Sequence, residues 1–228
     1  MSRLIAAAVA AYLGLAGGAQ ALVVTLDFEG LQNLEEVLGF YDGGAGSLGS
    51  SGGTDFGVEF EPGAVAIIDS DAGGSGNFGG EPTPDTILFF PSGSSAVMNV
   101  ADGFESGFSF FYAAPDEPGV VEVYDQVGAA GTLLASLSLP LTPDTGAPDP
   151  TGRFSPFEPF GVSFPGVARS VAFGGTADRV GFDNITFGSA TPGETGGVGG
   201  TEIPVPAALP LLVAGLGGLG LLRARRRA

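Results

Sequence analysis

Short apolar runs, separated by clusters of glycine, proline and aspartate, most limit what this 228-residue chain can fold into. Many short runs with frequent turn signals are typical of a β-sandwich or barrel. Between residues 22 and 202 a helical period appears only over 31–38, for a turn or two at most. The pattern therefore predicts strands over residues 22–28, 58–60, 65–68, 87–90, 96–100, 107–112, 120–124, 132–139, 162–164, 170–173 and 179–187.

Two of these segments make more detailed predictions. Residues 132–139 alternate with a period of two, which predicts that Leu133, Ala135, Leu137 and Leu139 share one face. The strands 107–112 and 120–124 are expected to pair across the turn at 115–119. We expect an all-β fold over residues 22–188, a mostly antiparallel β-sandwich of the jelly-roll sort.

Residue types that are missing exclude much chemistry. The chain has no histidine and no cysteine, so it cannot build a Ser-His-Asp or Cys-His nucleophile. Zinc, copper and haem sites are not expected without imidazole or thiolate ligands. No catalytic residue is identified, and the protein is expected not to be an enzyme. A surface glycosidase remains an alternative, because that chemistry needs only two carboxylates.

The charge of the chain is distributed unevenly. All 25 acidic residues lie between Asp27 and Glu202, where Arg153, Arg169 and Arg179 are the only cations. This region therefore carries 22 uncompensated negative charges. Such a surface repels phosphates, so nucleic acid is not an expected partner.

The N-terminus has the pattern of a secretory signal peptide. A short basic start at Arg3 is followed by an apolar, alanine-rich stretch. Ala19 and Ala21 fit the small-x-small cleavage rule, which predicts residues 1–21 as a signal peptide that is removed after Ala21. The main part of the chain is therefore expected to be exported.

The C-terminus carries a second hydrophobic signal. A Gly/Thr/Pro linker over residues 189–201 leads to a tail at 202–228. Its apolar part, 206–222, is close to the lower length limit for a spanning helix. The basic end is expected to stop transfer and to remain in the cytoplasm, and it contains Arg223, Arg225, Arg226 and Arg227.

A short motif with two prolines comes just before this apolar run. It reads Ile203, Pro204, Val205, Pro206, Ala207. With the apolar and basic segments that follow, it resembles a PEP-CTERM sorting signal, and more closely the Val-Pro-Leu-Pro-Ala variant. The resemblance implies an exosortase partner that cuts near the motif. It also implies passage through the inner membrane to the cell surface or the extracellular matrix. An ordinary membrane anchor is the alternative.

Carboxylates are the remaining candidate ligands, and they suit a hard cation such as calcium. One group joins Asp27 and Glu29, near the first predicted strand, with Asp183 in the last. The closing segment 180–187 is similar to the last strand of carbohydrate-binding jelly rolls. There, adjacent terminal strands share a structural calcium. A second acidic loop, containing Asp69 and Asp71, is a weaker candidate. Both groups have a plainer explanation, as a strand end or bulge and as a solvated loop.

The aromatic residues divide into core and candidate ligand contacts. Phe108 and Phe110 alternate along a strand and are expected in the core. Exposed rings suitable for stacking a sugar are sought among four residues, Tyr41, Phe78, Tyr112 and Tyr124. The sequence favours a non-catalytic surface or matrix protein, and the resemblance to PEP-CTERM proteins implies its association with exopolysaccharide or biofilm. The alternatives are a carbohydrate-binding module with a structural calcium and a surface glycosidase.

Overall fold

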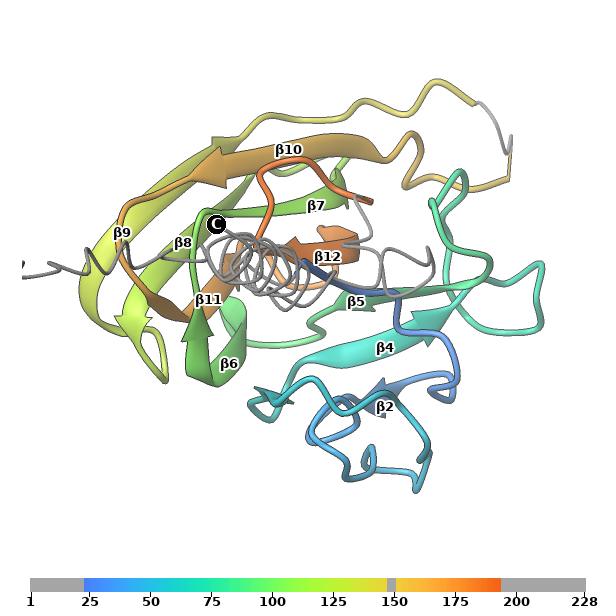
Figure 1. The fold of residues 1–228 in the computed structure, drawn as a ribbon. Helices are drawn as coiled ribbons and strands as arrows, with labels where there is room; N and C mark the ends of the chain where they lie inside the picture. Colours follow the sequence, from blue (N-terminus) through green and yellow to red (C-terminus); the bar gives the residue numbers. More distant parts are fainter. Residues whose placement is uncertain (1–22, 147–150, 194–228) are drawn as a thin grey trace, which may run out of the picture.

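The computed structural model describes residues 23–146 and 151–193, which form two antiparallel β-sheets (Figure 1). The predicted two-sheet β-sandwich is therefore confirmed. The seven-stranded sheet contains β1 (Val24–Leu26), β2 (Glu35–Glu36), β4 (Val65–Ile68), β5 (Thr86–Phe89), β7 (Gly107–Ala113), β10 (Glu158–Ser163) and β12 (Gly181–Phe187). The five-stranded sheet contains β3 (Val58–Phe60), β6 (Ser95–Phe104), β8 (Gly119–Gln126), β9 (Ala130–Leu139) and β11 (Ala168–Gly174).

The two ends of the described chain meet in one sheet. Strand β1 pairs antiparallel with β12, and Val24 lies opposite Phe187. The expected adjacency of the first and last strands is confirmed. Within residues 23–146 and 151–193, no helix is long and apolar enough to span a membrane.

The expected pairing of 107–112 with 120–124 is wrong. Strand β7 pairs with β12 and β10, whereas β8 pairs with β11 and β9 in the other sheet. The segment 114–118 therefore carries the chain from one sheet to the other. Pro115 and Pro118 lie in this connection, and a longer proline-containing connection does not fix a tight hairpin.

The alternation predicted for residues 132–139 is interrupted. Val123 of β8 lies opposite Ala135, but its neighbour Tyr124 lies opposite Leu133, so Leu134 is an extra residue in β9. Leu134, Ala135 and Leu137 pack against the core, while Leu133 is 47% exposed. The bulge thus turns Leu133 out of the face that it was expected to share.

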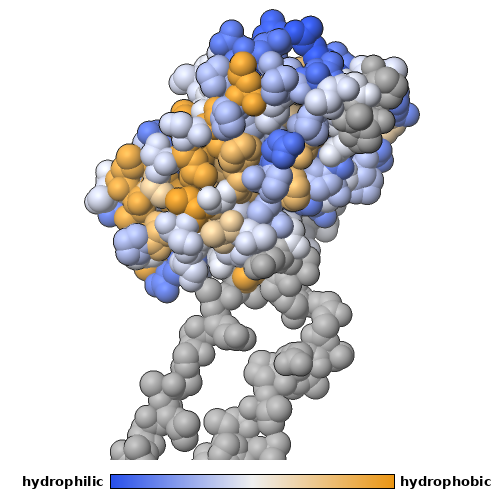
Figure 2. Space-filling view, turned by 90° about the horizontal axis from the view of Figure 1, so that it is seen from above, coloured by the Kyte–Doolittle hydropathy of each residue, from blue (hydrophilic) through white to orange (hydrophobic). Residues whose placement is uncertain are grey.

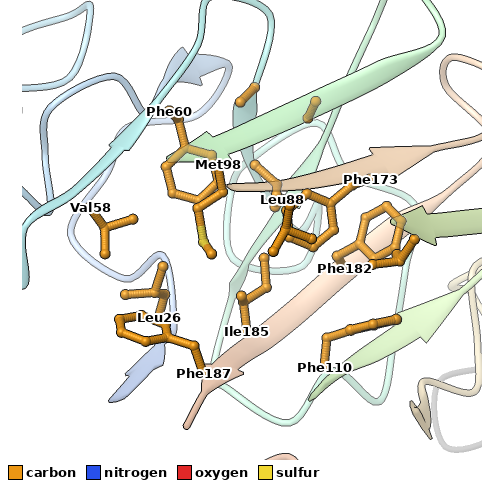
Figure 3. Packing of buried hydrophobic residues seen from close by; sticks show 14 of the residues in the cluster. Leu26, Val58, Phe60, Leu88, Met98, Phe110, Phe173, Phe182, Ile185 and Phe187 are labelled. Atoms are coloured by element: carbon orange, nitrogen blue, oxygen red, sulfur yellow. The ribbon is translucent and has the colours of Figure 1, made fainter. Parts of the chain in front are cut away.

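The main core fills the space between the sheets. Phe110, Phe173 and Phe182 contact one another, with ring centroids 5.1–6.3 Å apart. Figure 3 shows residues of both sheets pointing toward one another in this layer. Phe108 and Phe110 are fully buried, as predicted.

The outer face of the seven-stranded sheet is also covered. The loops 74–79 and 152–157 lie over it and bring Phe78 and Phe157 against Ile87 and Ala113. Central strands β7 and β12 are therefore buried on both faces, which explains the nearly continuous apolar sequence of β7. An apolar pocket of about 180 Å³ remains beside this cover, between residues such as Ile67, Phe89 and Phe154.

A different part of the surface is apolar and open. Figure 2 shows hydrophobic residues gathered on one side of the molecule, which corresponds to the region of β8, β9 and β10 in Figure 1. In β9, in β10 and just after β9, the exposed and half-buried apolar side chains include Leu133, Leu137, Leu141, Phe160 and Val162. The segment of residues 27–57, in contrast, lies at the opposite end of the view in Figure 1, below β4.

Candidate functional site

Asp27, Glu29 and Asp183 lie at one end of the β1–β12 pair, as their places in the sequence suggested. Asp27 and Glu29 follow β1, and Asp183 lies within β12. The phenol of Tyr41 lies close enough to Asp27 and Asp183 for both carboxylates to affect its pKa. Burial raises the pKa of Tyr41, and the charges of Asp27 and Asp183 raise it further. The Tyr41 hydroxyl lies 3.4 Å from Asp27 Oδ1 and accepts the N–H of Phe28 at 2.6 Å.

Asp183 is fully buried at an irregularity in β12. The register with β7 shifts after Asp183, and Asn184 has a φ of 46°, which re-aims the strand locally. The Asp183 carboxylate accepts the Thr83 hydroxyl at 2.7 Å and the Thr83 N–H at 3.1 Å. Burial raises the pKa of Asp183 to about 7 although these hydrogen bonds lower it. Asp183 thus holds a loop that lies 100 residues earlier in the chain.

Glu29 holds the next residues of the same loop. Its Oε1 accepts the N–H groups of Asp85 and Thr86 at 3.0 and 2.9 Å, and its Oε2 accepts the Thr86 hydroxyl at 3.2 Å. We call this arrangement the carboxylate clamp: Glu29 and Asp183 with residues 83–86. The clamp fixes the end of the Gly- and Pro-rich loop 69–85 where it enters β5.

The carboxylate clamp does not have the geometry of a metal site. Within the described parts of the chain, no group of three or more His, Cys, Asp or Glu side chains is placed to hold a metal ion. The oxygens of Glu29 and Asp183 accept hydrogen bonds from Thr83, Asp85 and Thr86 instead. In the second acidic loop, Asp69 Oδ2 accepts the N–H of Asp71. The predicted calcium site at Asp27, Glu29 and Asp183 stays a prediction, and it would require the clamp to open.

A further carboxylate was not anticipated from the sequence. Glu35 is fully buried, and it accepts hydrogen bonds from the backbone of Gln32, Leu48 and Ser50 and from the Ser50 hydroxyl. Burial raises its pKa, but these hydrogen bonds outweigh that effect, so the pKa of Glu35 lies below its ordinary value. Gly46 packs directly on Glu35, where a Cβ would lie 2.5 Å from Oε1. Glu35 thus organises the Gly/Ser loop 42–54.

A polar pocket of about 290 Å³ lies between the end of β1 and the Gly/Ser loop. The rings of Tyr41 and Phe56 are stacked in its wall, with centroids 6.3 Å apart and planes at 25°. Carboxylates, hydroxyls, glycines and a third aromatic residue complete the lining: Thr25, Asp27, Glu29, Gly30, Phe40, Ser51, Gly52, Gly53 and Thr54. Aromatic walls with a few polar groups are typical of small-ligand sites, although this pocket is at the small end of their range.

Most of the aromatic residues proposed as a sugar platform are in the interior. Tyr41, Phe78 and Tyr112 are 3%, 2% and 0% exposed, so they have no open ring face. Tyr124 alone among the four is half-buried, on the outer face of β8, where its hydroxyl donates to Glu122 at 2.8 Å. The platform prediction is therefore wrong for three of the four residues. Alternation alone did not separate core rings from surface rings in strands that are covered on both faces.

The predicted sorting elements lie outside the described residues. This applies to Ala19 and Ala21, to the motif over 203–207, to the apolar run 206–222, and to the four arginines after it. The fold therefore bears only on residues 23–146 and 151–193.

No protein-family model matches this chain, and no curated protein matches it. Its fold is similar to the K2 cleaved adhesin domain of Lys-gingipain, at 13% identity and a TM-score of 0.43 over 72% of this chain and 97% of that one. It is also similar to a carbohydrate-binding module from Cellvibrio mixtus lichenase 5A, solved with cellotriose, at 11% identity and a TM-score of 0.34 over 55% and 86% of the two chains. A third similar structure is CBM35 from Paenibacillus barcinonensis, at 14% identity and a TM-score of 0.33 over 58% and 92%.

At these identities and TM-scores the similarities carry no argument about a site or a ligand. The class of protein is defined by the strand pairing itself: an antiparallel two-sheet β-sandwich with a polar pocket at one end.

Proposed function

We propose that this chain is an exported, non-catalytic surface protein that is sorted by an exosortase-type system and associates with exopolysaccharide. The sorting step is supported by the order of the tail: the motif at 203–207, the apolar run 206–222 and the arginines at its end. Passage through the inner membrane to the cell surface or matrix follows from that order together with the signal peptide.

Cell fractionation with protease shaving tests the sorting step. The unaltered protein is expected to be accessible to protease from outside and to lose its tail. A Pro204→Ala, Pro206→Ala double variant is expected to remain in the inner membrane with its tail attached, since the motif is then broken. Recovery of the intact chain from the cytosol would overturn this part of the proposal.

The state of the carboxylates supports a non-catalytic role. A glycosidase needs two carboxyl groups that face the substrate. Asp27 and Glu29 line the polar pocket, but both oxygens of Glu29 are occupied by donors from Asp85 and Thr86. Among the described residues, Asp27 is then the one carboxylate of the pocket lining with an oxygen that accepts no hydrogen bond. This observation carries the proposal of a binding protein rather than an enzyme, and release of reducing sugar from any polysaccharide in a panel would contradict it.

A carbohydrate-binding module is the second candidate, and the polar pocket favours it. The half-buried ring of Phe56, next to hydroxyls and a carboxylate, matches the mixed character of a sugar, which has apolar C–H faces and polar edges. Direct binding of the full chain, in a non-ionic detergent, to a glycan array tests this candidate. Binding to no glycan on the array would leave a surface protein without a sugar-binding role.

A further inference from the structure

The charges around the polar pocket are all negative. Asp27 and Glu29 belong to its lining, and no lysine or arginine does. The charge of Asp183 also reaches this region, because it raises the pKa of Tyr41. Two of the three arginines of the exported part, Arg153 and Arg179, are instead drawn to Asp116. A ligand group with a negative charge, such as a uronate, would be repelled from this pocket.

Asp27 is the carboxylate in the pocket with room for a ligand. Its Oδ1 lies 3.3 Å from the Glu29 nitrogen and 3.4 Å from the Tyr41 hydroxyl, both long contacts. Its Oδ2 has no hydrogen-bond partner within the described residues, and the side chain is exposed. An ammonium group next to Asp27 would gain a charge-assisted hydrogen bond, which is about twice as strong as a neutral one.

The other polar groups of the pocket are also available. Within residues 23–146 and 151–193, the hydroxyls of Ser51 and Thr54 have no hydrogen-bond partner. Hydroxyls that both donate and accept suit the hydroxyl groups of a sugar ring. Gly52 has a φ of 94° and open space where a side chain would be, so the rim at this point is backbone alone. A ring can therefore approach the loop closely.

Phe56 can offer an apolar surface to the same ligand because it is half-buried, whereas Tyr41 and Phe40 are each only 3% exposed. Phe56 is half-buried and stacks on Tyr41, and Phe40 packs edge-on against Tyr41 with centroids 5.0 Å apart. An aromatic ring attracts a nearby cation through its negative face. Phe56 and Asp27 thus favour the same charge on the ligand.

We propose that the polar pocket binds an amino-sugar residue with a free ammonium group, as one unit of a polysaccharide, with the ammonium group on Asp27. This rests on the proposed association with polysaccharide and adds the charge class of the sugar. The pocket volume of about 290 Å³ suits one sugar unit rather than several.

Isothermal titration of the full chain in a non-ionic detergent tests the proposal, with a chelator present to keep divalent cations off the carboxylates. The probes are glucosamine oligomers, N-acetylglucosamine oligomers of equal length, and uronate oligomers. The glucosamine oligomer is expected to bind most tightly, and the uronate oligomer not at all. Asp27→Asn is expected to weaken the glucosamine interaction about tenfold, as for a lost hydrogen bond to a charged group.

Asp102→Asn is the matched control. Asp102 is exposed on β6 and outside the pocket lining, so this change removes the same charge from the same acidic protein. It is expected to leave binding unchanged. Thr54→Ala, which removes a hydroxyl without a structural partner, gives a second variant if Asp27→Asn does not fold, and it is expected to weaken binding of both amino-sugar oligomers.

The outcomes separate this proposal from the proposed function. Equal weakening by Asp27→Asn and Asp102→Asn would mean that the overall negative charge attracts the cation, and it would overturn the site. Equal affinity for the glucosamine and N-acetylglucosamine oligomers would mean that the pocket does not select a free ammonium group. Polysaccharide binding itself would still stand. Binding of the uronate oligomer would overturn the electrostatic argument. Binding of none of the three would overturn the site, while fractionation would still decide whether the protein is a sorted surface protein.

Discussion

The aromatic core and the loops at its end are held in place by different forces. Between the sheets, rings such as Phe110, Phe173 and Phe182 are buried with no polar partner to satisfy. In the loops 42–54 and 69–85 the sequence is rich in glycine and offers few apolar side chains to bury. There the backbone N–H groups are held by the carboxylates of Glu29, Glu35 and Asp183.

The difference explains how a chain with no cysteine and many glycines can order long loops. Ordering glycine-rich backbone costs more entropy than ordering other residues. A carboxylate that accepts several N–H groups offsets that cost, because hydrogen bonds to charged groups are among the stronger ones. Part of the large negative charge is therefore structural. It follows that the core should respond to loss of apolar volume, and the loops to pH and to loss of acceptors.

The largest effect is expected in the core. Phe182→Ala removes a fully buried ring that contacts Phe110, Tyr112 and Phe173. The free energy of unfolding, measured by urea denaturation followed by circular dichroism, should fall by about 3–5 kcal/mol. Leu133→Ala, at the exposed side of the bulge in β9, is the control and should change it by less than about 0.5 kcal/mol. Similar losses for both would mean that the β9 edge is covered.

The pH response should come next, and the two loops should respond with opposite sign. The folded pKa of Asp183 is about 7, above the unfolded value, so its contribution is present in acid and is lost as pH rises toward about 7. The folded pKa of Glu35 is lowered, so its contribution is lost as pH falls below about 4.3. Without calcium, the melting temperature should therefore be highest near about pH 5.

Asp183→Asn isolates the part of this prediction that concerns pH above about 5. With no titrating carboxyl at 183, the decline in melting temperature between about pH 5 and pH 7 should flatten. Calcium can then be added to the unaltered protein. A melting temperature that rises between about pH 5 and pH 7 in its presence would be the opposite of the decline expected without calcium. That outcome would mean that a cation holds Asp183 ionised, and it would support the predicted site at Asp27, Glu29 and Asp183.

These two regions also differ in how far the sequence predicts them. The β-sandwich follows from short apolar runs and turn signals, and the β1–β12 pair was expected at the right place. The expected pairing of β7 with β8 is wrong, because a proline-containing connection can either turn back within a sheet or cross to the other one. The bulge at Leu134 is set by its register with β8, which no pattern within β9 alone reveals.

The site is harder to predict for a physical reason. Asp27, Glu29 and Asp183 were identified because acidic residues at strand ends are conspicuous. Their partners Thr83 and Thr86 belong to a loop of ordinary composition, and Glu35 is one of many acidic residues. A buried Glu cannot be recognised without its N–H donors, which come from residues 32, 48 and 50. The sequence does contain one indication of such a residue, the Gly/Ser loop 42–54. Its backbone N–H groups need a hydrogen-bond acceptor if the loop is to be ordered.

A smaller effect than in the core is expected from Glu35→Gln. The amide places N–H donors where backbone N–H groups now donate, so part of the hydrogen bonding to the loop is lost. The free energy of unfolding should fall by about 1.5–3 kcal/mol, and amide hydrogen exchange should accelerate over residues 46–50. Glu59→Gln, an exposed carboxylate on β3, is the control and should change neither. Fast exchange over 46–50 in the unaltered protein would mean that Glu35 does not order this loop.

The smallest effect should come from the ion pair that looks strongest. Arg153 lies 2.7 Å from Asp116, but the two side chains are 54% and 35% exposed. Solvent screens such a pair, and holding two mobile side chains together costs entropy. Arg153→Gln should therefore produce no resolvable change in urea denaturation, in contrast to Glu35→Gln. If Arg153→Gln were instead less stable than Glu35→Gln, the surface ion pair would contribute more to the free energy of unfolding than a carboxylate that accepts backbone N–H groups.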